Sequence, residues 1–145
     1  MKNMLIAGMI VLCLAGCRTL GMAVIDQNFA EVDSLLKTGT QEIDDPDHTG
    51  TTPLLYAVSY GHPAMVKYLL DKGANIEARH AYTKRTPLLE GSYYGNVAVV
   101  EILVDRGADI QAVDGSGYNP LEYARKFHWD KIEKLLLDSG AKPIY

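Results

Sequence analysis

Short apolar runs separated by glycine follow one another along this chain. The stretch from Thr52 to Ala78 shows the pattern most fully, with a first apolar run from Pro53 to Tyr60 and a second from Pro63 up to Gly73. A threonine or asparagine followed by proline is typical of a helix N-terminus. Glycine after an apolar stripe is typical of a helix C-terminus. The pattern therefore predicts two short helices here, followed by an extended loop.

The same unit returns every 33–34 residues. Thr86-Pro87-Leu88 and Asn119-Pro120-Leu121 repeat the opening Thr52-Pro53-Leu54, and counting back from them predicts a degenerate first copy from about Thr19. Helices of under three turns are marginal alone, so each copy must bury its apolar stripe against the next. The sequence predicts an all-α solenoid of four helix-turn-helix repeats with short, β-like finger loops. The expected repeats are about 19–49, 50–83, 84–116 and 117–145.

Several short motifs recur in the two middle copies. In the second copy they are Thr52-Pro53-Leu54, Gly61-His62, Leu69-Leu70 and Gly73-Ala74-Asn75; in the third they are Thr86-Pro87-Leu88, Gly95-Asn96, Val99-Val100 and Gly107-Ala108-Asp109. These motifs resemble the ankyrin repeat, over about Thr19 to Tyr145. The family's histidine after T-P-L is absent, because Leu55, Leu89 and Glu122 stand there. The resemblance implies a module that binds another protein through a concave groove and its fingers.

Composition supports a single domain and excludes some partners. The chain has 145 residues, 48% of them hydrophobic, and a formal net charge of −4. That size and apolar content suffice for one core. The negative charge argues against a nucleic-acid groove and against electrostatic binding to a membrane surface. Both cysteines, Cys13 and Cys17, lie near the N-terminus, so no disulfide is expected within the repeats.

The N-terminus has the layout of an export signal. Lys2 precedes an apolar run of 11 residues from Met4 to Leu14, too short to cross a bilayer. Leu14-Ala15-Gly16-Cys17 then resembles the lipobox of bacterial lipoproteins. The resemblance implies a signal peptide at 1–16, a lipidated N-terminus at 17–18 with acyl chains (palmitate among them) on Cys17, and a repeat domain at 19–145. By resemblance to enterobacterial lipoproteins, Arg18 after the cysteine favours the outer membrane, facing the periplasm. The alternatives are an ordinary signal peptide cut nearby or a short membrane anchor.

Two sets of residues are candidates for contact with a partner. Tyr60, Tyr94 and Phe127 lie one repeat apart and should form an aromatic row along the groove, unless they belong to the core. The second set lies on the basic finger between Ala78 and Thr86, which contacts an acidic patch of a partner or is simply a solvated loop. The candidate partner-binding residues are Tyr60, Tyr93, Tyr94, Lys126, Phe127, Arg79, His80, Tyr82 and Lys84.

Other polar residues suggest chemistry only weakly. The acidic finger from Asp44 to Gly50 partly resembles a calcium loop, but Tyr56 stands where the last ligand would be, and a solvated turn is the simpler interpretation. Glu90 is a possible buried carboxylate, with Tyr56 or Tyr123 as its expected partner. Glu31 and Glu133 replace apolar residues of the middle copies and are expected to be polar caps at the two ends of the array.

The sequence thus predicts a non-catalytic protein-interaction module, lipid-anchored in a bacterial cell envelope and monomeric. No nucleophile with a base, carboxylate pair or metal cluster can be assembled, so no cofactor, metal, nucleic acid or small-molecule substrate is expected. An immunity-type inhibitor of a toxin delivered to the envelope is the alternative. An enzyme is a remote third hypothesis, for which Glu90 would be the only candidate.

Overall fold

The computed structural model describes residues 19–39 and 41–144, and within these ranges it contains eight helices in four pairs. Each pair is a helix-turn-helix unit, as predicted. The helices are α2 (Leu20–Ile25), α3 (Phe29–Lys37), α4 (Pro53–Ser59), α5 (Pro63–Asp71), α6 (Pro87–Tyr94), α7 (Val97–Asp105), α8 (Pro120–Lys126) and α9 (Asp130–Asp138).

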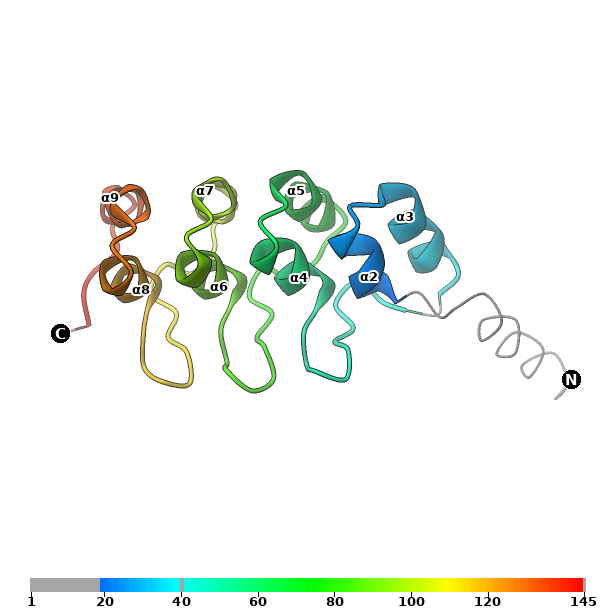
Figure 1. Cartoon of the computed structure of the whole chain (residues 1–145), viewed down its shortest axis with the longest axis horizontal. Coiled ribbons are helices and arrows are strands. Elements are labelled where there is room, and N and C mark those ends of the chain that lie inside the picture. The colour runs from blue at the N-terminus through cyan, green and yellow to red at the C-terminus, as the bar shows by residue number, and fades with distance from the viewer. Residues whose placement is uncertain (1–18, 40, 145) are drawn as a thin grey trace, which may run out of the picture.

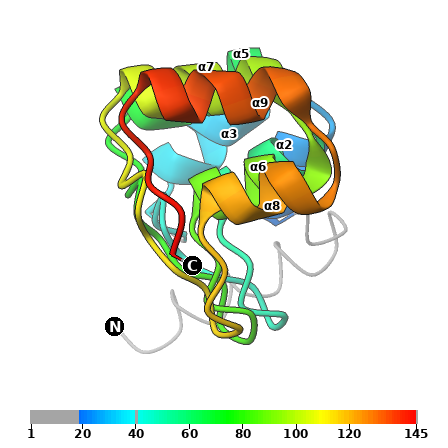
Figure 2. The same cartoon turned by 90° about the vertical axis from the view of Figure 1, so that its left-hand side faces the viewer.

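The four pairs stand side by side along the long axis of the molecule (Figure 1). Helices α2, α4, α6 and α8 form an inner layer, and α3, α5, α7 and α9 form an outer layer. Three loops hang from the inner layer on the same side, and the end-on view in Figure 2 places them one behind another. The predicted all-α solenoid of four repeats is therefore confirmed.

Side-chain caps set the start of each inner helix. The hydroxyl of Thr52 accepts a hydrogen bond from the amide of Leu55, and that of Thr86 accepts one from Leu89. At α8, Asn119 and Glu122 form a complete capping box. These bonds satisfy amides that have no partner inside the helix. The start of each inner helix is therefore determined by residues next to it in the sequence.

Apolar residues at repeat spacing form one continuous core between the two layers. Leu54, Leu88 and Leu121 are fully buried, and the cluster that they join runs from Leu20 to Ala141. Burying such a side chain contributes about 2 kcal/mol. Because each helix is short, this stabilisation depends on contact with the neighbouring repeats.

The expected polar caps at the ends of the array are half-buried. Glu31 accepts a hydrogen bond from the side chain of Asn28, which caps α3. Glu133 forms an ion pair of 2.8 Å with Arg125 on the inner helix of the same repeat. Both carboxylates thus contribute polar contacts to the first and last repeats.

Neighbouring fingers are joined to each other by backbone hydrogen bonds. The amide of Ala81 donates to the carbonyl of Gly50, and that of Gly115 donates to Thr83. A side chain at Gly50 would place its Cβ 2.1 Å from that of Ala81, and its backbone has φ +75°. Only glycine fits this close approach without strain.

The predicted signal peptide, the lipobox and Cys17 lie outside the described residues. Among the helices that are described, none combines the length and the apolar character needed to cross a membrane.

Candidate functional site

The predicted aromatic row lies at the surface of the inner layer. Tyr60, Tyr94 and Phe127 are each at the C-terminal end of an inner helix, and 57%, 49% and 37% of their surface is exposed. These values exclude the core alternative. Solvent reaches all three rings, so a partner protein could also reach them.

Ring contacts divide this row into two groups. Tyr93 lies edge-on to both Tyr94 and Phe127, with ring centroids 5.0 and 5.2 Å apart. Tyr60 instead contacts His62 of its own repeat at 6.0 Å. The third and fourth repeats therefore share one aromatic platform (Tyr93, Tyr94 and Phe127), while Tyr60 stands beside it.

A stack of rings and cations supports this platform. The guanidinium of Arg85 lies 3.8 Å from the ring centroid of Tyr93 and 5.4 Å from that of Tyr123. Tyr118 stacks on Tyr123 at 5.2 Å, and the Lys126 ammonium lies 4.5 Å from the Tyr118 ring. We call these five residues the cation–aromatic stack. Contacts of this kind are attractive and fix the rings in place.

In the stack, the cation and the aromatic ring occupy opposite positions in two consecutive repeats. Arg85 and Tyr118 hold the same position of consecutive repeats, as do Tyr93 and Lys126. In the third repeat the loop supplies the cation and the helix supplies the ring; in the fourth repeat these roles are reversed. Sequence reasoning singled out Tyr93 and Lys126 but missed Arg85, Tyr118 and Tyr123. The sequence signal that could have identified these three residues was the reversed order of cation and ring at equivalent positions.

Glu90, which the sequence left as a possible buried carboxylate, is buried, but its partners differ from those predicted. Its carboxylate forms an ion pair of 3.2 Å with Arg85 and accepts a hydrogen bond of 3.3 Å from Ser59. The prediction of Tyr56 or Tyr123 as the partner is wrong, because both hydroxyls donate to finger aspartates instead. Glu90 balances the charge of Arg85 beneath the platform.

The two finger aspartates, Asp47 and Asp114, lock their loops in the same way. One carboxylate oxygen of Asp114 accepts from the amides of Ser116 and Tyr118 at 2.8 and 3.1 Å, and the other accepts from the hydroxyl of Tyr123. Burial and the bond to Asp114 raise the pKa of Tyr123 to about 12, so its hydroxyl remains a donor. The finger between them, from Ala78 to Thr86, has Ala81 at the equivalent position and cannot accept these hydrogen bonds.

Asp47 shows how strongly such a loop holds its carboxylate. Burial disfavours the charged form, but hydrogen bonds from Thr49 and Tyr56 and from the amides of Thr49 and Thr51 outweigh it and lower the pKa of Asp47 to about 2. In the described ranges no group of three or more histidine, cysteine or acidic residues could hold a metal ion. These bonds support the interpretation of Asp44 to Gly50 as a structural turn.

The basic finger uses two of its four predicted contact residues for its own structure. Arg79 donates to the carbonyl of Lys84 and, across to the next finger, to that of Val113, at 2.9 and 2.8 Å. The ring nitrogen Nδ1 of His80 accepts from the amides of Tyr82 and Thr83. The Tyr82 side chain is 75% exposed, and Lys84 is exposed as well. In the described part of the chain the side chains of Tyr82 and Lys84 make no such hydrogen bond, whereas Arg79, although exposed, and His80 hold the loop.

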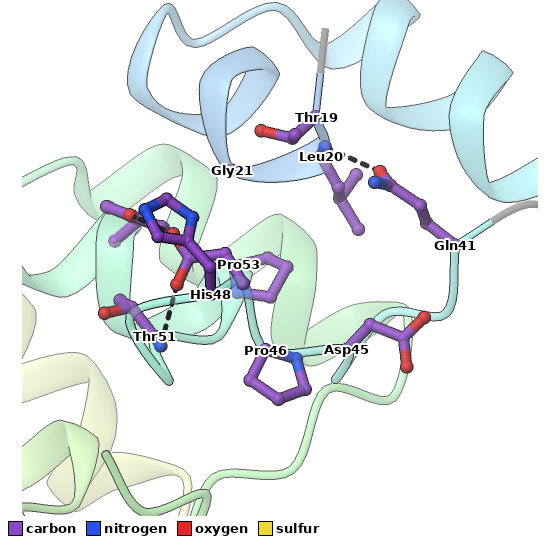
Figure 3. A pocket seen from close by; sticks show the side chains of 11 residues that line it. Thr19, Leu20, Gly21, Gln41, Asp45, Pro46, His48, Thr51 and Pro53 are labelled. Atoms are coloured by element: carbon purple, nitrogen blue, oxygen red, sulfur yellow. Dashed lines mark hydrogen bonds between the residues drawn. The ribbon is translucent and has the colours of Figure 1, made fainter. Parts of the chain in front are cut away.

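A hollow of about 340 Å³ lies beside the first repeat, between α2, the first finger and the start of α4 (Figure 3). Two hydrogen bonds lie within its lining: Gln41 accepts from the amide of Leu20 at 2.7 Å, and Asp47 accepts from that of Thr51 at 3.2 Å. The sequence did not predict this hollow, which forms where the finger folds back beside α2. Its lining offers no reactive pair of side chains.

Comparison with known proteins gives a consistent picture. A family model of ankyrin repeats in three copies matches residues 4–80, and a second model of ankyrin repeats matches residues 61–104. A poly(ADP-ribose) polymerase, tankyrase, of Caenorhabditis elegans is 38% identical over 68 residues. That match covers 45% of this chain and 3% of the polymerase, so the chain spans a very small part of the relative's length.

Proposed function

The chain belongs to the ankyrin-repeat family, whose repeats form protein–protein interaction modules, and from that premise we propose that it binds a partner protein in the bacterial cell envelope. Its contact surface would be the aromatic platform and Tyr60 on the inner layer, together with the exposed end of the basic finger. The partner would be periplasmic or envelope-associated, and the module itself would be monomeric and non-catalytic.

The exposed aromatic side chains carry this proposal. Tyr60, Tyr94 and Phe127 stand at one position of successive repeats and remain in solvent, although burial would have been favourable for each of them. Aromatic side chains clustered on a rigid surface are typical anchors of protein interfaces. The stack beneath the platform holds these rings in place before binding, which lowers the entropic cost of association.

Replacing the three anchors together tests the surface. The triple variant Tyr60→Ser, Tyr94→Ser and Phe127→Ser should bind the partner at least about tenfold more weakly, equivalent to 1.4 kcal/mol. Crosslinking in the native periplasm would first identify the partner, and titration calorimetry would then compare the two forms. Leu137→Ser on the outer layer is the control, since that side chain is also exposed, at 43%. Affinity within about twofold of the original would rule out this surface.

The envelope location rests on the sequence from Leu14 to Cys17. Only Arg18 and Thr19 separate Cys17 from Leu20, the first residue of α2. Three residue steps span at most about 11 Å, so a lipid on Cys17 would keep the first repeat close to the bilayer. Stable anchoring requires more than one acyl chain, which lipoprotein processing would supply.

Cys17→Ser tests the anchor directly. The variant should move from the membrane fraction to the soluble fraction and lose incorporation of a palmitate analogue. Cys13→Ser is a matched control, because Cys13 lies within the predicted signal peptide and should have no such effect. Membrane retention and labelling that persist in Cys17→Ser would exclude lipidation of this thiol.

A further inference from the structure

The acidic side chains beneath the aromatic platform already have partners. Glu90 is paired with Arg85, and Asp114 accepts from Tyr123 and two backbone amides. Two further acidic residues of the last repeat are also engaged: Glu122 in the capping box and Glu133 with Arg125. These four carboxylates are therefore balanced or used from within.

Two lysines, Lys126 beside the platform and Lys84 on the basic finger, are in the opposite situation. Lys84 and Lys126 are exposed, and neither lies within ion-pair distance of any carboxylate in the described part of the chain. The uncompensated charge next to the platform is positive, although the whole protein is negative. An anionic group is the electrostatic complement of this surface.

Lys126 is held more firmly than a typical surface lysine. Its ammonium lies 4.5 Å from the ring centroid of Tyr118 and 5.8 Å from that of Phe127. Phe127 is also part of the aromatic platform. A cation held against aromatic rings is attracted to them and loses less side-chain freedom on binding. The ammonium therefore stands at the edge of an apolar surface, in a defined position.

Arg85 cannot perform the same role. Its guanidinium stacks on Tyr93 and is paired with Glu90, with Asp114 3.8 Å away. It is a positioning residue for the platform, and its charge is already balanced. Lys126 is thus the cation of the stack that remains available to a partner.

We propose that the partner presents a carboxylate side chain next to an aromatic or aliphatic one. The carboxylate pairs with Lys126, and the apolar side chain lies against Tyr94 and Phe127. This inference rests on the proposed function and adds the chemistry of the partner, an acidic and apolar protein segment. The fixed positions of the lysine and the rings would also set the direction in which that segment lies across the third and fourth repeats.

Peptide display against the full chain, kept in mild detergent, tests this proposal. Random peptides selected on the unmodified protein should be enriched in Asp or Glu beside Phe, Tyr, Leu or Ile. Selection on Lys126→Glu should replace the acidic preference by Lys or Arg. The matched control is Lys134→Glu, a charge reversal at an exposed lysine of the outer helix α9, and it should leave the selected peptides unchanged.

Affinity measurements on one selected peptide then separate the outcomes. Lys126→Glu should weaken binding about fivefold or more, and changing the peptide's Glu to Lys should restore much of the loss. Lys126→Gln, which adds no negative charge near the end of α8, serves if the reversal disturbs folding. Apolar peptides without an acidic preference, lost in the triple serine variant, would overturn this proposal and leave the proposed surface standing. Peptides that bind the triple serine variant equally well would overturn both.

Discussion

Replacing Asp47 by asparagine should weaken the first finger in a pH-dependent way. One oxygen of the carboxylate accepts from the amides of Thr49 and Thr51, at 2.8 and 3.2 Å, and the other accepts from the hydroxyl of Tyr56. Asparagine has the same shape and retains one acceptor oxygen. It loses the negative charge, and its amide nitrogen is a donor where the carboxylate had its second acceptor.

The expected magnitude follows from the pKa of the carboxyl group. Its pKa falls from 3.8 to about 2 in the folded protein. That difference corresponds to at most about 2.5 kcal/mol of stability at neutral pH. Because solvent reaches part of the group, we expect about 1–2 kcal/mol. A lowered pKa means that this stabilisation is present above the unfolded-state pKa and is lost as pH falls from about 5 toward 2.

Urea unfolding of residues 19–145, followed by far-UV circular dichroism between pH 7 and pH 2.5, measures this effect. Asp47→Asn should be about 1–2 kcal/mol less stable than the original protein at pH 7, and the two curves should converge as Asp47 becomes protonated. Other acidic groups titrate in both proteins, so the difference isolates Asp47. Asp105→Asn is the control, because that carboxylate is exposed at the end of α7. A gap that stays constant down to pH 2.5 would refute the role of the charge.

Two further predictions concern packing. Gly95→Ala should cost about 2–3 kcal/mol, because Gly95 has φ +76° and an added Cβ would lie 2.5 Å from the Trp129 ring. Gly107→Ala, at φ +81° with no atom within 4 Å of the added Cβ, should cost only about 1 kcal/mol. Equal urea midpoints for the two glycine variants would contradict the steric argument. Leu88→Ala should cost about 2–5 kcal/mol, because the side chain is fully buried. Leu137→Ala, 43% exposed, should stay within about 0.5 kcal/mol, and a comparable loss in calorimetry would contradict the assignment of the core.

Much of the fold was predictable because its signals are local. The hydroxyl of Thr52 caps the helix that follows it directly, and the capping box of Asn119 and Glu122 spans four residues. The leucines of the core could be assigned because a stripe at helical spacing has only one face to bury. Spacing also predicted that Tyr94 and Phe127 face the same way, and the family resemblance favoured the outward side, but the core alternative was excluded only by their exposure.

The contacts beneath the platform were not predictable in this way. Glu90 and Tyr123 hold equivalent positions, yet one is paired with Arg85 and the other donates to Asp114. Which of the two contacts forms depends on the path of the loop that folds back over each helix. Helical spacing carries no information about that path. The prediction of tyrosine partners for Glu90 failed for this reason.

The sequence by itself determined the four units, their helix ends and the buried stripe. These properties depend on residues within one repeat, which interact over a few positions of the chain. Only the tertiary structure decided that Arg85 lies between the rings of two different repeats and that Lys126 is left without a carboxylate in the described part of the molecule. Such contacts join side chains from separate repeats and loops, so their geometry exists only once the stack has formed.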